Sequence, residues 1–410
     1  MNTDSMHLTY DFTTILERKG HDALAVDGLG RGFAPGKPGD GFSVIPMWVA
    51  DMNFPCLPAI QEHVIRRMEH PAYGYFIPSD EYYDAIIRWQ KTRNGVKDLN
   101  ETQIGYENGV LGGVMSALSA LCAPKEKILV HRPTYIGFSA SLMNAGYMMV
   151  HSDLKKDGDG IWRMDLEDME QKFRDENIHV LLFCSPQNPC GRVWTAEELE
   201  DMLALCKKYD VWIISDEIWS DLILTHSPVQ HLPLQSVNEY GRERTVGLYA
   251  PSKTFNLAGL IGSYHIIYND ELRKRVRKAG SLSHYNNMNV LSMHALIGAY
   301  SDEGQVWVDE LRQVLTANVR YAVGRIRKEW PGVDVAMPEG TYMLFLDCNE
   351  WCAAHQTTVD TLLETGWKVG VMWQDGRPFG GRNTIRMNLA LPASLLEEAF
   401  DRLQKYVFKS

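Results

Sequence analysis

Lys253 is the residue with the clearest potential for chemistry. It stands between two hydroxyl side chains, Ser252 and Thr254, after the β-prone run 245–249 and before a segment of small residues. The loop after a strand is where a rigid scaffold presents a reacting group. A lysine amine that is partly removed from water has a lowered pKa and can attack a carbonyl carbon. An ordinary loop lysine is the alternative, and it is favoured when Lys253 is considered alone.

Further groups with chemical potential follow other predicted strands. The start of a small-residue helix offers free N–H groups that can bind a phosphate. This helix start is at Gly109-Val110-Leu111. The other groups at strand ends are the aromatic ring of Tyr135, the amide of Asn188, the carboxylate of Asp216 and the guanidinium of Arg386. Each group also has an ordinary interpretation, as a tight turn, a core ring, a turn amide, a helix cap or a surface ion pair.

One cofactor, pyridoxal phosphate (PLP), would use all of these groups. Its aldehyde requires an amine such as Lys253, its phosphate a helix start helped by Ser252, and its ring a stacking partner. Its ring nitrogen needs a carboxylate such as Asp216 beside it, because only the protonated ring is a strong electron sink. The carboxylate of an amino-acid substrate suits a bidentate arginine such as Arg386. We therefore predict PLP as the cofactor.

Composition and charge exclude several other classes. The chain has 410 residues, of which 45% are hydrophobic and 23% charged, which is ordinary for a globular protein with a large core or two domains. A net charge of −11 makes nucleic acid and anionic membrane poor partners. The short basic run 273–278 reads as the solvated face of a helix. We expect a small-molecule substrate, no nucleic acid and no membrane.

The cysteines and the N-terminus indicate the compartment. Seven cysteines are scattered without a CxxC pair, so neither a disulfide framework nor a zinc site is predicted, and no metal is expected. The first ten residues lack a basic region followed by an apolar one, and no apolar run reaches about 18 residues. We expect a cytoplasmic protein.

Short apolar strands alternate with helices through the middle of the chain. Buried-strand patterns at 127–131, 180–184 and 211–216 alternate with helical segments, which predicts an α/β fold with a mostly parallel sheet covered by helices. Loops after such strands converge on one edge, where these folds bind ligands. Ser79 and the capping box Thr195–Glu198 predict helix starts.

The pattern changes after about residue 290. A long helical stretch at 306–328 precedes strands near 340–347 and 383–390, and Ser394 is predicted to cap the last helix. This α+β layout predicts two domains. The large cofactor-binding domain spans 56–290, and both chain ends, 1–55 and 291–410, form the small domain.

Four motifs identify a family resemblance. Asn188-Pro-Cys-Gly191, Asp216-Glu217, Ser252-Lys253-Thr254 and Arg386-Met-Asn388, in this order, resemble the fold-type-I aminotransferase superfamily. More narrowly, segments 46–54, 191–194, 216–222 and 250–260 resemble the branch of cystathionine β-lyase and cystalysin-type C–S lyases. The likeness covers nearly the whole chain. It implies a large domain with a sheet of the seven-stranded type, and a homodimer whose active sites lie at the subunit interface.

The resemblance also implies a role for each matching residue. Lys253 would hold the cofactor and later remove the Cα proton. Asp216 would bind the ring nitrogen, Asn188 the ring hydroxyl oxygen, and Tyr135 would stack on the ring. The phosphate would be bound by Gly109, Val110, Leu111, Ser252 and, from the other subunit, Tyr75. Arg386, with the backbone of Ala50, would bind the substrate carboxylate.

Three positions bear on the branch. Trp219 stands where this branch usually has histidine and true aminotransferases have tyrosine; its indole can donate to a cofactor oxygen but cannot titrate. Gln187 replaces a histidine that is common before Asn-Pro. Ile261 stands where many aminotransferases carry a phosphate-binding arginine, which agrees with the lyase branch.

The implied activity is α,β-elimination from cystathionine or an S-substituted cysteine, giving a thiol, pyruvate and ammonia. Two alternatives stay open. An aminotransferase would share every step up to the loss of the Cα proton. A regulatory binding protein could retain the fold for holding a partner.

Overall fold

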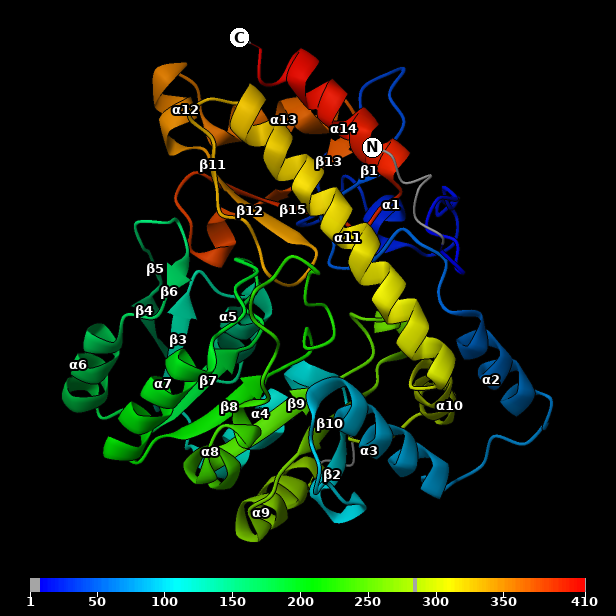
Figure 1. Ribbon diagram of the computed structural model, residues 1–410, viewed down its shortest axis with the longest axis vertical. Helices are drawn as coiled ribbons and strands as arrows, with labels where there is room; N and C mark the ends of the chain where they lie inside the picture. The colour runs from blue at the N-terminus through cyan, green and yellow to red at the C-terminus, as the bar shows by residue number, and fades with distance from the viewer. Residues whose placement is uncertain (1–7, 283–285, 410) are drawn as a thin grey trace.

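A seven-stranded sheet forms the lower half of the molecule in Figure 1. The computed structural model describes residues 8–282 and 286–409. In spatial order the strands are β2 (Ile104–Glu107), β10 (Ser263–Ile266), β9 (Thr245–Tyr249), β8 (Trp212–Asp216), β7 (Val180–Cys184), β3 (Lys127–Arg132) and β4 (Met148–Asp153). β10 is antiparallel to both of its neighbours and the other pairings are parallel. The predicted mostly parallel sheet is confirmed, and the carboxyl ends of its six co-directional strands share one edge.

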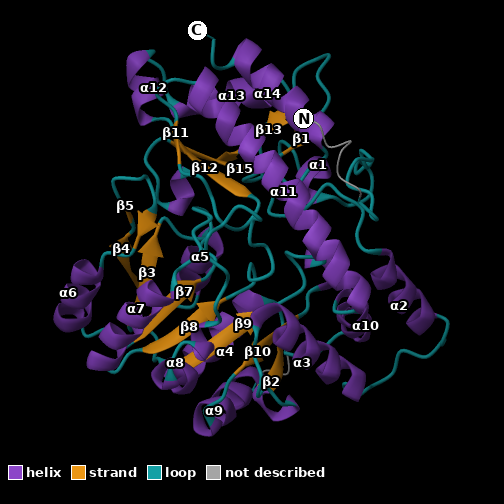
Figure 2. Ribbon diagram, in the orientation of Figure 1, coloured by secondary structure: helices purple, strands orange, loops and turns teal. Residues whose placement is uncertain are grey.

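Helices cover both faces of this sheet (Figure 2). Alternate residues of one strand enter different cores: Ile128 and Val130 pack on one face and Leu129 on the other. The first face is covered by α4 (Val110–Leu121), α5 (Ile136–Asn144) and α9 (Asp270–Ser281), and the second by α6 (Leu166–Glu176), α7 (Ala196–Lys208) and α8 (Glu239–Arg244). Burial on both faces explains why these strands read as continuous apolar runs.

A second, antiparallel sheet lies above the first. It comprises β11 (Asp334–Val335), β12 (Met343–Asp347), β15 (Thr384–Asn388) and β14 (Gln374–Asp375). Helices α11 (Asp302–Glu329), α12 (Asn349–Ala354), α13 (Val359–Lys368) and α14 (Ala393–Tyr406) surround it (Figure 1). The 28 residues of α11 make a rod of about 42 Å that descends from this sheet towards α10 (Val290–Ala299).

The N-terminal segment packs against the C-terminal part of the chain. Strand β1 (Ile45–Pro46) pairs in parallel with β13 (Val371–Met372), and Phe12 contacts Trp307 of α11 at a centroid distance of 5.5 Å. The remaining elements are α1 (Leu24–Asp27), α2 (Pro58–Met68), α3 (Asp80–Asn94), the hairpin β5 (Lys155–Lys156) and β6 (Trp162–Arg163), and the 3₁₀ helices Glu101–Gln103, Leu234–Ser236, Ala258–Leu260 and Arg377–Phe379.

Two of the three predicted helix caps are confirmed. Ser79 accepts a hydrogen bond from Tyr82 N, and Thr195 forms a reciprocal capping box with Glu198. The predicted cap at Ser394 is wrong, because Pro392 is the N-cap and Ser394 already lies in the first turn of α14.

In the described part of the chain, no helix has both the length and the apolar character that crossing a membrane requires.

Candidate functional site

A cavity of about 310 Å³ lies at the carboxyl edge of the seven-stranded sheet. It is lined by Ala50, Asn108, Gly109, Val110, Leu111, Tyr135, Asn188, Asp216, Ile218, Trp219, Ser252, Lys253, Ala258, Ile261 and Gly262. Every predicted site residue except Arg386 and Tyr75 is in this set. The loops after β2, β3, β7, β8 and β9 supply most of the lining, as the common strand direction requires.

Lys253 projects its amine across the cavity towards the N-terminal segment. It follows β9, and Nζ donates a hydrogen bond to Ala50 O at 2.9 Å. Burial, together with the nearby Arg386 guanidinium, lowers the pKa of Lys253 to about 8. An appreciable fraction of this amine is therefore unprotonated near neutral pH, which is the form that attacks a carbonyl or accepts a proton.

Asp216 is a buried carboxylate at the end of β8, with 4% of its surface exposed. Oδ1 accepts a hydrogen bond from Ile218 N at 3.1 Å. Burial raises the pKa of this carboxyl to about 7. Among the described residues, no lysine, arginine or histidine forms an ion pair with it. A cationic ligand group would satisfy this carboxylate.

The N-terminus of α4 faces the cavity. Gly109 is the N-cap with φ +78°, a conformation that favours glycine, and Val110 and Leu111 open the first turn. The N–H groups of a first turn have no acceptor within their own helix, and the helix dipole adds partial positive charge there. Ser252 lines the same cavity and offers a hydroxyl. These groups suit an anion such as a phosphate.

Tyr135 and Asn188 enter from the loops after β3 and β7. The Tyr135 ring lies so close to Gly137 that a Cβ at Gly137 would be 2.3 Å from it, and Phe138 supports the ring edge-on at a centroid distance of 5.5 Å. Asn188 is buried. The preceding Gln187, with its side chain bound to Pro133 O at 2.6 Å and Cys190 N at 3.0 Å, fixes the loop that carries Asn188.

Arg386 reaches the site from the other sheet, on β15. It is 3% exposed, donates to Asn188 Oδ1 at 3.3 Å, to Trp48 O at 3.1 Å and to Gln374 Oε1 at 2.6 Å, and its Nε has no partner. Burial lowers the pKa of Arg386 to about 10. No carboxylate among the described residues pairs with it. A ligand carboxylate would fill this role.

Trp219 and Tyr342 form an aromatic wall. Trp219 is buried, meets Tyr342 edge-on at a centroid distance of 4.8 Å, and its ring centroid lies 5.8 Å from Lys253 Nζ. Tyr342 donates to Ala50 O at 3.0 Å. Tyr342 was missed from the sequence because it directly precedes the apolar strand β12 and reads as part of it. Asn108 also lines the cavity and was not predicted. Its position directly before Gly109, at the start of the predicted phosphate-binding helix, could have indicated it.

Tyr75 lies away from this cavity. Its side chain is fully exposed, on the loop between α2 and α3, and it lines a separate hollow with Tyr106 and Met288. Within one chain, the structure therefore does not bring Tyr75 to the other predicted residues.

The donor set fits PLP. Asp216 and Arg386 are buried ionisable groups near the Lys253 amine, and neither has a counter-ion among the described residues. Buried charges are ordinarily paired. A protonated ring nitrogen and a substrate carboxylate would supply both missing partners, and the α4 N-terminus with Ser252 would hold the phosphate.

Comparison with known proteins agrees with this geometry. The family model for aminotransferase class I and II matches residues 48–403. The chain belongs to the aminotransferase class I and II family. The cystathionine β-lyase PatB of Bacillus subtilis is 32% identical over 90% of this chain and 94% of its own length. The protein MalY of Escherichia coli is 30% identical over 95% of this chain and 96% of its own.

Solved structures of this family share the fold. Cystalysin from Treponema denticola, whose crystal structure contains a pyridoxal 5′-phosphate cofactor, superposes with a TM-score of 0.87 at 29% identity, covering 97% of this chain and 98% of its own. The predicted fold-type-I architecture and the predicted resemblance are confirmed.

Proposed function

We propose that this chain is a PLP-dependent C–S β-lyase that acts on cystathionine or an S-substituted cysteine. The observation that carries the proposal is the Lys253 amine, with a pKa lowered to about 8, near a buried carboxyl (Asp216) and a buried guanidinium (Arg386) that have no ion-pair partner among the described residues. Relatives named as cystathionine β-lyase and cystalysin, similar over nearly the whole chain, support the lyase branch. So does Ile261, which lines the cavity where many aminotransferases carry an arginine.

Each residue then has a chemical task. When bound, PLP supplies a ring that withdraws the electron pair released at the substrate Cα. Arg386 holds the α-carboxylate and orients the Cα–H bond. The free amine of Lys253 takes the Cα proton, and the Cβ–S bond breaks with its electron pair leaving on the thiolate. Hydrolysis of the remaining three-carbon fragment gives pyruvate and ammonia.

Asp216 and the α4 N-terminus would act on the cofactor itself. The Asp216 carboxylate would keep the ring nitrogen protonated, because an anion beside a cation favours the charged form. Asn188 would hold the ring hydroxyl oxygen and Tyr135 would stack on the ring. Gly109, Val110, Leu111 and Ser252 would bind the phosphate.

We further propose a two-domain subunit, with 56–290 as the large domain and both chain ends as the small one. The parallel pairing of β1 with β13 supports this division. The assembly proposed is a homodimer in which the fully exposed Tyr75 reaches the partner's phosphate site. The proposed location is the cytoplasm, and the seven free cysteines suit a reducing compartment.

An absorbance spectrum with product assays tests the function. The purified protein is expected to show a visible PLP band that disappears in Lys253→Ala, and to release pyruvate and free thiol repeatedly from L-cystathionine or S-methyl-cysteine. Turnover only when a keto acid is supplied would identify an aminotransferase instead. Absence of the band after PLP is added would refute both enzymes and favour the regulatory binding protein.

A further inference from the structure

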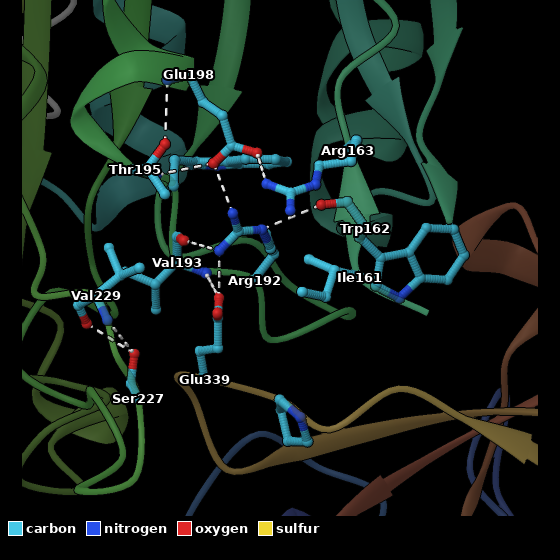
Figure 3. Close-up of polar contacts among 12 residues, drawn as sticks. Ile161, Trp162, Arg163, Arg192, Val193, Thr195, Glu198, Ser227, Val229 and Glu339 are labelled. Atoms are coloured by element: carbon cyan, nitrogen blue, oxygen red, sulfur yellow. Dashed lines mark hydrogen bonds and ion pairs between the residues drawn. The ribbon is translucent and has the colours of Figure 1, made fainter. Parts of the chain in front are cut away.

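Arg192 connects the loop after β7 to the segment that precedes β12 of the second sheet (Figure 3). Its side chain is 4% exposed and forms an ion pair with Glu339 through Nη1. Nη2 donates to Glu198 Oε2 at 2.6 Å, and Nε donates to Trp162 O at 3.1 Å. The Glu339 carboxylate also accepts from Val193 N at 3.0 Å. The pair is therefore enclosed and fixed from both sides.

The backbones on either side of this pair touch. Glu339 N and Gly340 N both donate to Gly191 O, at 2.8 and 2.9 Å, and Leu224 N donates to Glu339 O at 2.8 Å. A Cβ at Gly191 would lie 2.4 Å from Pro338 Cβ, so only glycine permits this approach. The segment 338–341 is thus joined to two loops of the seven-stranded sheet.

Each side of the junction continues into the candidate site. Asn188 lies three residues before Gly191. In the other direction the segment leads through Tyr342, whose hydroxyl donates to Ala50 O, into β12. β12 pairs with β15, which places Arg386 on the neighbouring strand, and Arg386 contacts Asn188 at 3.3 Å.

We propose that Arg192 and Glu339 are positioning residues whose ion pair sets the placement of Arg386 relative to Asn188. It would thereby orient the substrate carboxylate against the cofactor ring. This inference rests on the proposed function of the same site. Neither residue lines the cavity, so both act only through the segments that they connect.

The physical basis is the cost of leaving a buried charge incompletely compensated. Removal of the Glu339 charge leaves the enclosed Arg192 with Glu198 as its carboxylate partner, and Glu198 also pairs with Arg163. Two guanidinium groups then share one carboxylate, so we expect the junction to shift. A displacement of about 1 Å in a substrate-positioning group can cost about 100-fold in rate.

The test compares Glu339→Gln and Arg192→Lys with a matched control, Asp334→Asn. Asp334 also forms an ion pair between the second sheet and the β5–β6 hairpin, with Lys156, but its side chain is 66% exposed. The holoenzyme of each variant is titrated calorimetrically with L-alanine, which has the α-carboxylate but no leaving group at Cβ. The PLP dissociation constant, the kcat and KM for L-cystathionine, and the free energy of unfolding are measured alongside.

The expected result is a rise of about tenfold in the L-alanine Kd and in KM for Glu339→Gln, with a loss of about 10- to 100-fold in kcat/KM and unchanged PLP affinity. Arg192→Lys keeps the positive charge but loses the planar guanidinium that contacts two carboxylates at once, so we expect a smaller loss of kcat/KM. Asp334→Asn should match the wild type.

A change in unfolding free energy alone, with the L-alanine Kd and KM of the wild type, would show that the pair is only structural and overturn the proposal. If the wild-type protein binds L-alanine but releases no pyruvate from L-cystathionine or S-methyl-cysteine, the lyase function is refuted. The L-alanine titration would still test the positioning role. Absence of L-alanine binding to the wild type would refute both.

Discussion

Replacing Asp216 with asparagine should stabilise the cofactor-free protein while removing its activity. The carboxyl is 4% exposed and has no cationic partner among the described residues. Its pKa is raised by burial from 3.8 to about 7. The folded state therefore opposes ionisation of this group, and asparagine, which has no proton to lose, avoids that cost.

The magnitude and sign follow from proton linkage. A rise of about three pKa units corresponds to about 4 kcal/mol. Below the unfolded pKa of 3.8 the carboxyl is protonated in both states, and the wild-type protein bears no such cost. As the pH rises from there through the folded pKa of about 7, the free energy of unfolding of the wild-type protein falls progressively. Asp216→Asn should thus be more stable than wild type by up to about 4 kcal/mol near pH 8, and by less than half of that near pH 5.

The assay is urea unfolding of cofactor-free protein near pH 8 and near pH 5, followed by tryptophan fluorescence. Asp201→Asn on the solvated face of α7 serves as control and should change stability by less than about 0.5 kcal/mol at both pH values. With PLP bound, the advantage of Asp216→Asn should disappear, because the wild-type carboxylate then has a cationic partner. Equal or lower stability of cofactor-free Asp216→Asn near pH 8 would refute the reasoning.

Three further predictions address other parts of the molecule. Arg386→Lys should raise KM by about 10-fold or more, because a point charge cannot make the bidentate contact, and an unchanged KM would place the substrate carboxylate elsewhere. Gly191→Ala, whose Cβ would lie 2.8 Å from Gly340 O at φ +68°, should lower the urea unfolding free energy by about 2 kcal/mol or more; Gly324→Ala, with open space around it in α11, should raise it by about 0.5 to 1 kcal/mol. Tyr75→Phe should raise the PLP dissociation constant about tenfold if its hydroxyl reaches the phosphate site of the proposed partner subunit, without changing the sedimentation coefficient, and equal affinity would remove Tyr75 from the site.

The sequence predicts the part of the site that follows strand ends. Asp216 and Lys253 each come after an apolar strand, so their presence at one edge follows from the parallel sheet alone. Gly109 is recognisable because a helix of small residues begins after it. In these cases the chemical signal and the structural signal are adjacent in the chain.

Contacts between distant segments left no such signal. Glu339 pairs with Arg192 across 147 positions, and no local pattern distinguishes it from a surface acid. Tyr342 directly precedes the apolar strand β12, and its hydrogen-bond partner Ala50 lies 292 positions away in the chain. Ser394 illustrates the opposite error: a plausible capping sequence was overridden because the chain enters α14 at Pro392.

Helix α11 has a mechanical consequence. Near its middle, Thr316 accepts from Thr225 N at 2.8 Å, and Asn318 donates to Leu389 O at 2.9 Å, just beyond β15. Its lower half is joined to α3, where Arg93 contacts Asp309 at 2.8 Å. The helix is therefore held near its middle by both parts of the molecule. If it tilted as a rigid rod about that point by about 5°, each end would move by about 2 Å, in opposite directions. Any movement of the strand that bears the buried guanidinium would be transmitted to α3, which directly follows the exposed loop proposed to reach the other subunit.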